Sequence, residues 1–164
     1  MTTYNGISYE NGSVPTSVLA PLDGQPGASL RSDAADAWNR AKAEALRETG
    51  IDLTVRGWNR TLEEQRRFFF ERYEPQSVGG GPFGDVRWYQ GIRYVRVRGA
   101  SAAIPGMSNH GLGLAVDVND YGGVGEFGNY RRVATFPILA KHGWTDSEGR
   151  GPIQEPWHLV YDPA

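Results

Sequence analysis

The sequence contains no cysteine and only three histidines in 164 residues. Without cysteine the chain has no disulfide framework, no iron–sulfur cluster, no thiolate zinc site and no cysteine nucleophile. Any metal ion that the protein binds must therefore be held by imidazole and carboxylate groups.

Long hydrophobic runs are also missing, because no apolar stretch approaches the roughly 18 residues that a membrane-spanning helix needs. The first residues, MTTYNGISYENGSVPTS, lack the basic region followed by an apolar region that marks a signal peptide. We therefore expect synthesis in the cytoplasm, no export by an ordinary signal peptide and no membrane partner.

An excess of positive charge is absent as well, since 17 Lys and Arg stand against 19 Asp and Glu, for a net charge of −2. Such a balance provides no bulk attraction to nucleic acid. Residues 93–98, Arg-Tyr-Val-Arg-Val-Arg, contain three arginines, but the interleaved aromatic platform of a nucleic-acid enzyme is missing. We interpret this segment as a charged edge strand and expect no nucleic-acid partner.

The length suits one domain, residues 1–164, which would bury about two thirds of the surface that its unfolded chain exposes. Residues 1–30 are rich in Gly, Pro, Ser and Thr, and three prolines interrupt any regular element there. We expect an extended N-terminal arm over the surface of the domain.

Two helices begin with recognisable signals. Ser32 or Asp33 is expected to cap a helix that ends at Gly50, and Thr61 with Glu64 forms a capping box that opens a second helix. A third helix over residues 129–142 would be kinked or divided by Pro137.

Short apolar segments between and after these helices predict strands over residues 51–55, 93–98, 115–118 and 158–161, and residues 74–92 are expected to form a loop. This order of elements favours an α+β fold with a small, mainly antiparallel sheet and flanking helices.

The candidate chemistry lies around two of the three histidines. A catalytic zinc site needs three protein ligands, an open position for water and a nearby base. His110 and Asp117 lie at the two ends of a glycine-containing turn, and His158 would come from a neighbouring strand, with Glu155 just before it. A hydrogen-bonded structural His–Asp pair is an alternative to a metal site, and His142 could replace Asp117 as the third ligand.

Two motifs carry a resemblance to a known family. Ser108-x-His110-x-x-Gly113-x-Ala115-x-Asp117, followed by Glu155-x-Trp157-His158, resembles the paired signature of the D-alanyl-D-alanine carboxypeptidase and L-alanyl-D-glutamate endopeptidase zinc peptidases. These enzymes cut the stem peptides of bacterial peptidoglycan.

A third segment, Gly57–Gln65, is similar to the Gly-Tyr-Arg-Ser…Gln segment of that family, with one residue inserted or substituted before the arginine. The three motifs occur in the expected order, and the match covers about residues 55–161. The first 30 residues and residues 74–100 match nothing in the family pattern.

The resemblance implies a role for each matched residue. His110, Asp117 and His158 would bind one zinc ion per chain, and Glu155 would be the general base. Arg60 would stabilise the oxyanion, with Arg56 as the alternative. The substrate-binding candidates are Ser108 and Gln65, which would contact polar groups of the substrate or support the site, and Trp157, which would orient the base and the ligand beside it.

The predicted function is that of a monomeric zinc peptidase that hydrolyses peptidoglycan stem peptides. We favour an L-alanyl-D-glutamate endopeptidase of the phage endolysin type, which would act on the cell wall after release from the host cytoplasm. The alternatives are a D-alanyl-D-alanine carboxypeptidase of the same family and a non-catalytic zinc-containing module that binds the cell wall. Glu155 distinguishes the two peptidases from the binding module, because a binding module needs no base three residues before a ligand.

Overall fold

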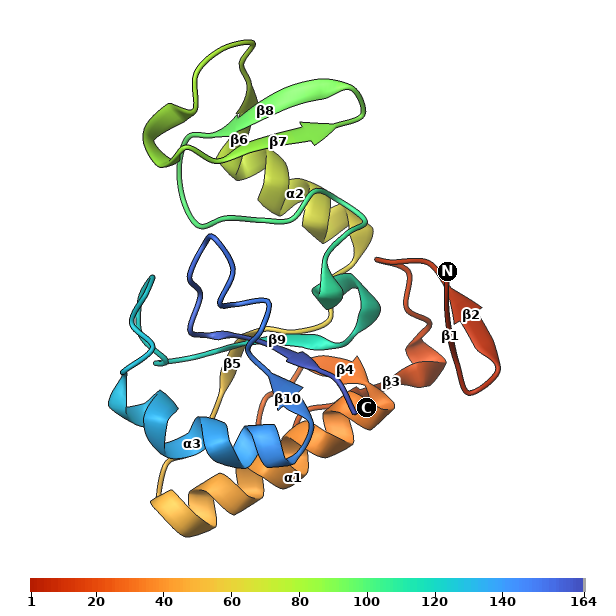
Figure 1. Ribbon diagram of the computed structural model, residues 1–164. Helices are drawn as coiled ribbons and strands as arrows, with labels where there is room; N and C mark the ends of the chain where they lie inside the picture. The colour runs from red at the N-terminus through yellow and green to blue at the C-terminus, as the bar shows by residue number, and fades with distance from the viewer. Residues whose placement is uncertain (164) are drawn as a thin grey trace.

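Figure 1 shows a computed structural model of the chain, which describes residues 1–163. A four-stranded antiparallel sheet forms its centre, in the order β10-β11-β9-β5. The strands are β5 (Val55–Gly57), β9 (Ala115–Val118), β10 (Trp144–Thr145) and β11 (His158–Tyr161). The mixed helices and small antiparallel sheets confirm the predicted fold class.

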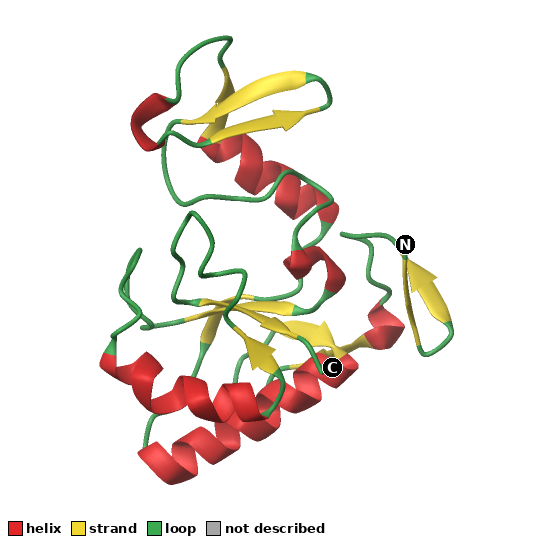
Figure 2. Cartoon of the chain, viewed as in Figure 1, coloured by secondary structure: helices red, strands yellow, loops and turns green. Residues whose placement is uncertain are grey.

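Two helices, α1 (Ser32–Thr49) and α3 (Tyr130–Lys141), pack against each other on one side of this sheet (Figures 1 and 2). The main core lies between them and the sheet, and its fully buried members include Trp38, Val116, Leu139 and Leu159. This packing leaves the other side of β9 and β11 available for polar side chains.

A second lobe lies beyond the central sheet, at the top of Figure 1. Helix α2 (Leu62–Arg72) leads into a three-stranded antiparallel sheet of order β6-β8-β7, made of β6 (Tyr73–Pro75), β7 (Val86–Tyr89) and β8 (Ile92–Arg96). The lobe has its own aromatic core of Phe69, Tyr73 and Tyr94.

The prediction of a loop over residues 74–92 is therefore wrong, and β8 is a central strand instead of an edge strand. The reason is a tight turn at Gln90 and Gly91, both with positive φ (51° and 78°), which pairs β7 with β8. Asp85 then joins the strands, because its carboxylate accepts hydrogen bonds from Tyr73, Arg87 and Arg96.

The prediction of an extended N-terminal arm is also wrong. Residues 1–31 form two antiparallel strand pairs, β1 (Thr2–Tyr4) with β2 (Ile7–Tyr9) and β3 (Leu19–Pro21) with β4 (Ser29–Arg31), separated by the 3-10 turn η1 (Thr16–Val18). The Asn5-Gly6 turn closes the first pair, with φ values of 50° and 75°. Leu22, Ala28 and Leu30 belong to the main core.

The helix boundaries follow the sequence signals with one exception. Gly50 ends α1 in the left-handed conformation with φ 75°, and the Thr61–Glu64 capping box opens α2. The predicted cap of α1 is wrong: Arg31 occupies the N-cap position without a side-chain bond, because β4 runs directly into the helix. Pro137 lies inside α3 without dividing it.

The predicted strand over residues 51–55 reaches the sheet only at Val55. Before Val55, Lys42 Nζ donates a hydrogen bond to the carbonyl oxygen of Leu53, and the backbone N–H of Asn119 donates one to the carbonyl oxygen of Thr54. Leu53 and Thr54 thus bond these groups instead of pairing with a neighbouring strand. Among residues 1–163, no helix is both long and apolar enough to cross a membrane.

Candidate active site

Three elements carry the three candidate metal ligands of the two main motifs. Ser108 precedes the short 3-10 helix η3 (Asn109–Leu112), and its hydroxyl accepts a hydrogen bond from the backbone N–H of His110 (3.2 Å). Gly113 adopts φ 72° and turns the chain into β9, which carries Asp117. In the adjacent strand β11, His158 lies directly opposite Asp117 in the ladder.

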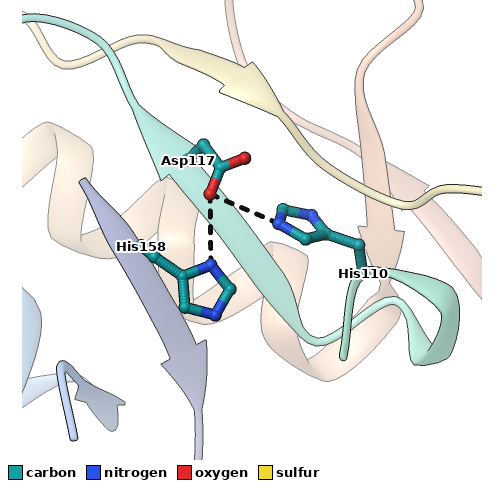
Figure 3. Close-up of side chains that lie close together, drawn as sticks. All are labelled: His110, Asp117 and His158. Carbon is teal, nitrogen blue, oxygen red and sulfur yellow. Dashed lines mark hydrogen bonds and ion pairs between the residues drawn. The ribbon is translucent and has the colours of Figure 1, made fainter. Parts of the chain in front are cut away.

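These elements bring His110, Asp117 and His158 together (Figure 3). One oxygen of Asp117, Oδ1, lies 3.3 Å from His110 Nε2 and 3.1 Å from His158 Nδ1. The three potential ligand atoms all lie within 4.8 Å of one another. Two imidazole nitrogens and a carboxylate oxygen are a donor set that suits zinc.

The other nitrogen of each imidazole also has a partner. His110 Nδ1 lies 2.9 Å from the carbonyl oxygen of Trp58, and His158 Nε2 lies 2.9 Å from Glu148 Oε1. Because a carbonyl or carboxylate oxygen accepts, these contacts favour the tautomers that leave His110 Nε2 and His158 Nδ1 free to bind a cation. Both rings are thus oriented for coordination.

Charge in this cluster is strongly coupled. Burial would raise the pKa of Asp117, but His110 and His158 hold it well below the usual value. Burial would lower the pKa of His158, but its hydrogen bonds to Asp117 and Glu148 raise that pKa to about 10. The site therefore favours a positive charge next to the Asp117 carboxylate, which a bound metal ion also supplies.

Gly57 in β5 makes room for Asp117. A Cβ atom at Gly57 would lie 2.5 Å from Asp117 Oδ2, closer than such atoms approach. Only a glycine therefore leaves the carboxylate in its present position. Sequence reasoning included Gly57 in the family segment without assigning it this role.

A pocket of about 590 Å³ opens beside the cluster and is lined by residues of both the central sheet and the second lobe. Its lining includes the three cluster residues and, of the other predicted site residues, Glu155, Arg60, Ser108 and Trp157. Arg56, the alternative to Arg60, also lines it, with its guanidinium 4.9 Å from the centre of the Trp157 ring.

Gln65 is placed differently from the others. It is only 3% exposed, and its side chain bonds the backbone N–H of Gly106 and the side chain of Asn11, with distances of 2.9 and 3.0 Å. It does not line the pocket. Of the two alternatives for Gln65, the structure favours support of the site over contact with substrate.

Two glutamates stand near His158, and their surroundings differ. Burial raises the pKa of Glu155, and no group of the described residues donates a hydrogen bond to its carboxylate. Glu148 has both oxygens bonded, to His158 and Asn109, and its pKa is lowered, first by the bond to His158. A raised pKa and an unbonded carboxylate suit a proton acceptor, so the geometry favours Glu155 as the base.

Arg60 lines the pocket and lies just before the start of α2. Its Nη2 lies 3.8 Å from Asp117 Oδ2, and its guanidinium lies 4.5 Å from the centre of the Phe68 ring. Its backbone N–H bonds the carbonyl oxygen of His110 (2.9 Å), which fixes this segment to η3. Arg60 therefore presents a cation beside the metal-ligand cluster.

The third histidine lies elsewhere. His142 is the C-cap of α3, and its Nε2 lies 3.2 Å from Glu44 Oε1. It lines neither the pocket nor the cluster. The histidine that could have replaced Asp117 is thus outside the candidate site.

Comparison with known proteins agrees with this arrangement. The family model VanY, described as D-alanyl-D-alanine carboxypeptidase, matches residues 27–164. The chain belongs to this family. Membership makes it a peptidase of the VanY class, which confirms the predicted family and enzyme class. The match begins at residue 27, so it includes α1, which the sequence motifs did not reach.

Solved structures with the same fold share only 20 to 22% of their residues with this chain. A vancomycin resistance D,D-pentapeptidase VanY in complex with Zn(II) is 22% identical, with 90% of this chain and 82% of that chain covered and a TM-score of 0.55. The LdcB LD-carboxypeptidase is 21% identical, with coverage of 92% and 70% and a TM-score of 0.59. The D,D-dipeptidase VanXYg is 20% identical, with 87% of this chain and 55% of that chain covered and a TM-score of 0.55. No curated protein matches the sequence.

Proposed function

We propose that this protein is a zinc-dependent peptidase that hydrolyses the stem peptides of bacterial peptidoglycan. The observation that carries the proposal is the convergence of His110 Nε2, Asp117 Oδ1 and His158 Nδ1 beside Glu155 in one pocket. Membership of the VanY family and the Zn(II) complex of a structural neighbour support it.

These three atoms would hold the metal. Zinc, when bound there, lowers the pKa of a water molecule and polarises the scissile carbonyl group. Trp58 and Glu148 already orient the two imidazoles, so neither ring needs to rotate to accept a cation. At His158 the cation would replace the proton on Nδ1, the nitrogen that faces Asp117.

Glu155 would act as general base and then as general acid. Its carboxylate accepts a proton from the attacking water and returns that proton to the nitrogen of the leaving amine, which breaks the amide bond. Burial raises the pKa of Glu155 and so makes it a better proton acceptor than an exposed glutamate.

Arg60 would stabilise the negative charge that develops on the carbonyl oxygen. Its guanidinium is largely buried, with 19% of the side chain exposed, and lies on the Asp117 side of the pocket. A fixed cation in a site that excludes water stabilises an oxyanion more than a mobile one does. Ser108 would contact a polar group of the peptide, and Trp157 would hold the segment that carries Glu155.

Two bonds of the stem peptide are candidates for cleavage. The family description and the VanY complex with D-alanine-D-alanine favour the terminal D-alanyl-D-alanine bond. Our sequence-based proposal is the internal L-alanyl-D-glutamate bond, cut by an endolysin of phage type that acts on the wall after release from the host cytoplasm. Both reactions use the same metal centre.

Digestion of purified peptidoglycan with the zinc-loaded protein tests these proposals. Mass spectrometry of the fragments would show loss of single D-alanine residues for a carboxypeptidase. It would show stem peptides that begin at D-glutamate for an endopeptidase. Unchanged peptidoglycan and unchanged stem peptides, from protein that binds one zinc ion per chain, would instead support the non-catalytic binding module.

A further inference from the structure

Glu148 is a carboxylate that the proposed mechanism does not use as a base or a ligand. It lies in the segment between β10 and β11, and 53% of its side chain is exposed. Both oxygens are nevertheless bonded: Oε1 lies 2.9 Å from His158 Nε2, and Oε2 lies 2.6 Å from Asn109 Nδ2. An exposed glutamate that is held in this way is restricted for a reason other than core packing.

The two partners of Glu148 belong to the two segments that carry the imidazoles. His158 is itself a candidate ligand, and Asn109 directly precedes His110 in η3. The Glu148 carboxylate therefore connects its own segment to both sides of the metal-ligand cluster. It contacts the nitrogen of His158 that faces away from Asp117, because Nδ1 is the nitrogen that faces Asp117.

The segment around Glu148 is held on both sides. Before it, Asp146 Oδ2 accepts a hydrogen bond from the buried Arg132, which also bonds the carbonyl oxygen of Pro156 (3.0 Å). After it, Gly149 packs so closely against the turn that a Cβ atom there would lie 2.5 Å from the carbonyl oxygen of Glu155. Glu148 is thus presented to His158 by a fixed segment.

We propose that Glu148 is a positioning residue of the metal centre, and this inference rests on the proposed zinc-dependent function. Its carboxylate keeps the proton of His158 on Nε2 and fixes the rotation of the ring, so that the Nδ1 lone pair points at the metal. A carboxylate behind a ligating imidazole also makes that imidazole more basic. His110 has only the neutral carbonyl of Trp58 in the corresponding place, so among the described residues Glu148 is the one charged partner behind a ligating imidazole.

Zinc affinity tests this proposal without depending on catalysis. Glu148→Ala, Glu148→Gln and the matched control Glu48→Gln, which removes the same charge from an exposed position in α1, would be compared by competition with a chromophoric chelator. We expect about 10- to 100-fold weaker zinc binding for Glu148→Ala and a smaller loss for Glu148→Gln, which keeps an acceptor oxygen. Glu48→Gln should bind zinc as the wild type does.

A spectroscopic measurement separates positioning from general destabilisation. The visible absorption bands of the Co(II)-substituted protein should shift in Glu148→Gln and not in Glu48→Gln, while the melting temperatures of the metal-free proteins stay close. Equal zinc affinity and an unchanged Co(II) spectrum in both Glu148 variants would overturn the proposal. A wild-type protein that binds no zinc would instead overturn the proposed function itself.

Discussion

At the scale of single residues, the geometry of the site depends most on Asp117. One of its oxygens meets both imidazoles, and the other faces Arg60 and fills the space that Gly57 leaves open. A single carboxylate thus links three different segments of the chain. Two predictions belong to this scale.

Asp117→Ala should abolish stable zinc binding, because it leaves two imidazoles as the only remaining ligands in the cluster. His142→Ala should keep one zinc ion per chain, since His142 bonds Glu44 and lies outside the cluster. Metal analysis of the purified variants after dialysis measures both. Loss of zinc from His142→Ala with retention in Asp117→Ala would show that the third ligand is wrong.

Glu155→Gln should retain zinc and lose activity, because the amide cannot accept the proton of the attacking water. General-base catalysis contributes about 10²- to 10⁴-fold, so we expect a decrease in kcat of that size. Hydrolysis of a synthetic stem peptide and metal analysis would be measured on the same preparation. Activity within about twofold of wild type would exclude Glu155 as the base.

At the scale of elements, α2 and its strands form one wall of the pocket. The Thr61–Glu64 capping box starts α2 directly after Arg60 and so fixes the backbone position from which the Arg60 side chain extends. The lobe beyond α2 is held by Asp85, which has only 6% of its side chain exposed and bonds Tyr73, Arg87 and Arg96.

Asp85→Asn should destabilise the protein at neutral pH by about 3 kcal/mol, because it leaves two arginines without their buried counter-charge. Burial alone would raise the pKa of Asp85, but bonds from Arg87 and Tyr73 lower it below the usual value. Since the pKa is lower in the folded state, this carboxylate stabilises the protein above its unfolded pKa, and the contribution is lost as the pH falls through the folded value.

Denaturant unfolding at pH 7 and pH 3 would measure this effect. The difference in the free energy of unfolding between wild type and Asp85→Asn should be smaller at pH 3. Asp36→Asn, which removes an exposed partner of Arg40, is the control and should change little at either pH. A difference that stays constant with pH would contradict the assigned role.

At the scale of the whole molecule, the pocket is lined by residues of both the central sheet and the second lobe, and its walls are rich in arginine. Arg72 is one of these arginines, and its guanidinium lies 4.8 Å from the centre of the Phe68 ring. No carboxylate of residues 1–163 lies within ion-pair distance of it. Peptidoglycan stem peptides carry carboxylates, which suits such a wall.

Arg72→Gln should therefore raise KM for a stem peptide about tenfold and leave kcat nearly unchanged, because it removes a charge-assisted contact with the substrate and no reacting group. Steady-state kinetics at low and high salt would show the effect, which should diminish as salt screens the charge. Arg66→Gln, at an exposed position on the same helix, serves as the control. Equal KM values for both variants would exclude Arg72 from substrate binding.

The elements with local signals were predictable from the sequence. The Thr61–Glu64 capping box, the stop at Gly50 and the strand at His158–Tyr161 each depend on neighbouring residues, and the structure confirms them. The N-terminal strand pairs and the second sheet were not predicted, because short strands become stable only when a partner strand and a core are present.

The sequence by itself determined the kind of site, since a chain without cysteine and with three histidines leaves imidazole and carboxylate as ligands, and the spacing of the motifs pointed to the family. Only the tertiary structure decided that Asp117 and not His142 joins the cluster, that Gln65 is buried away from the pocket, and that Glu148 bonds the outer nitrogen of His158. The physical reason is strand pairing: the β9–β11 ladder sets His158 opposite Asp117, and distance along the chain does not encode which residues a sheet places side by side.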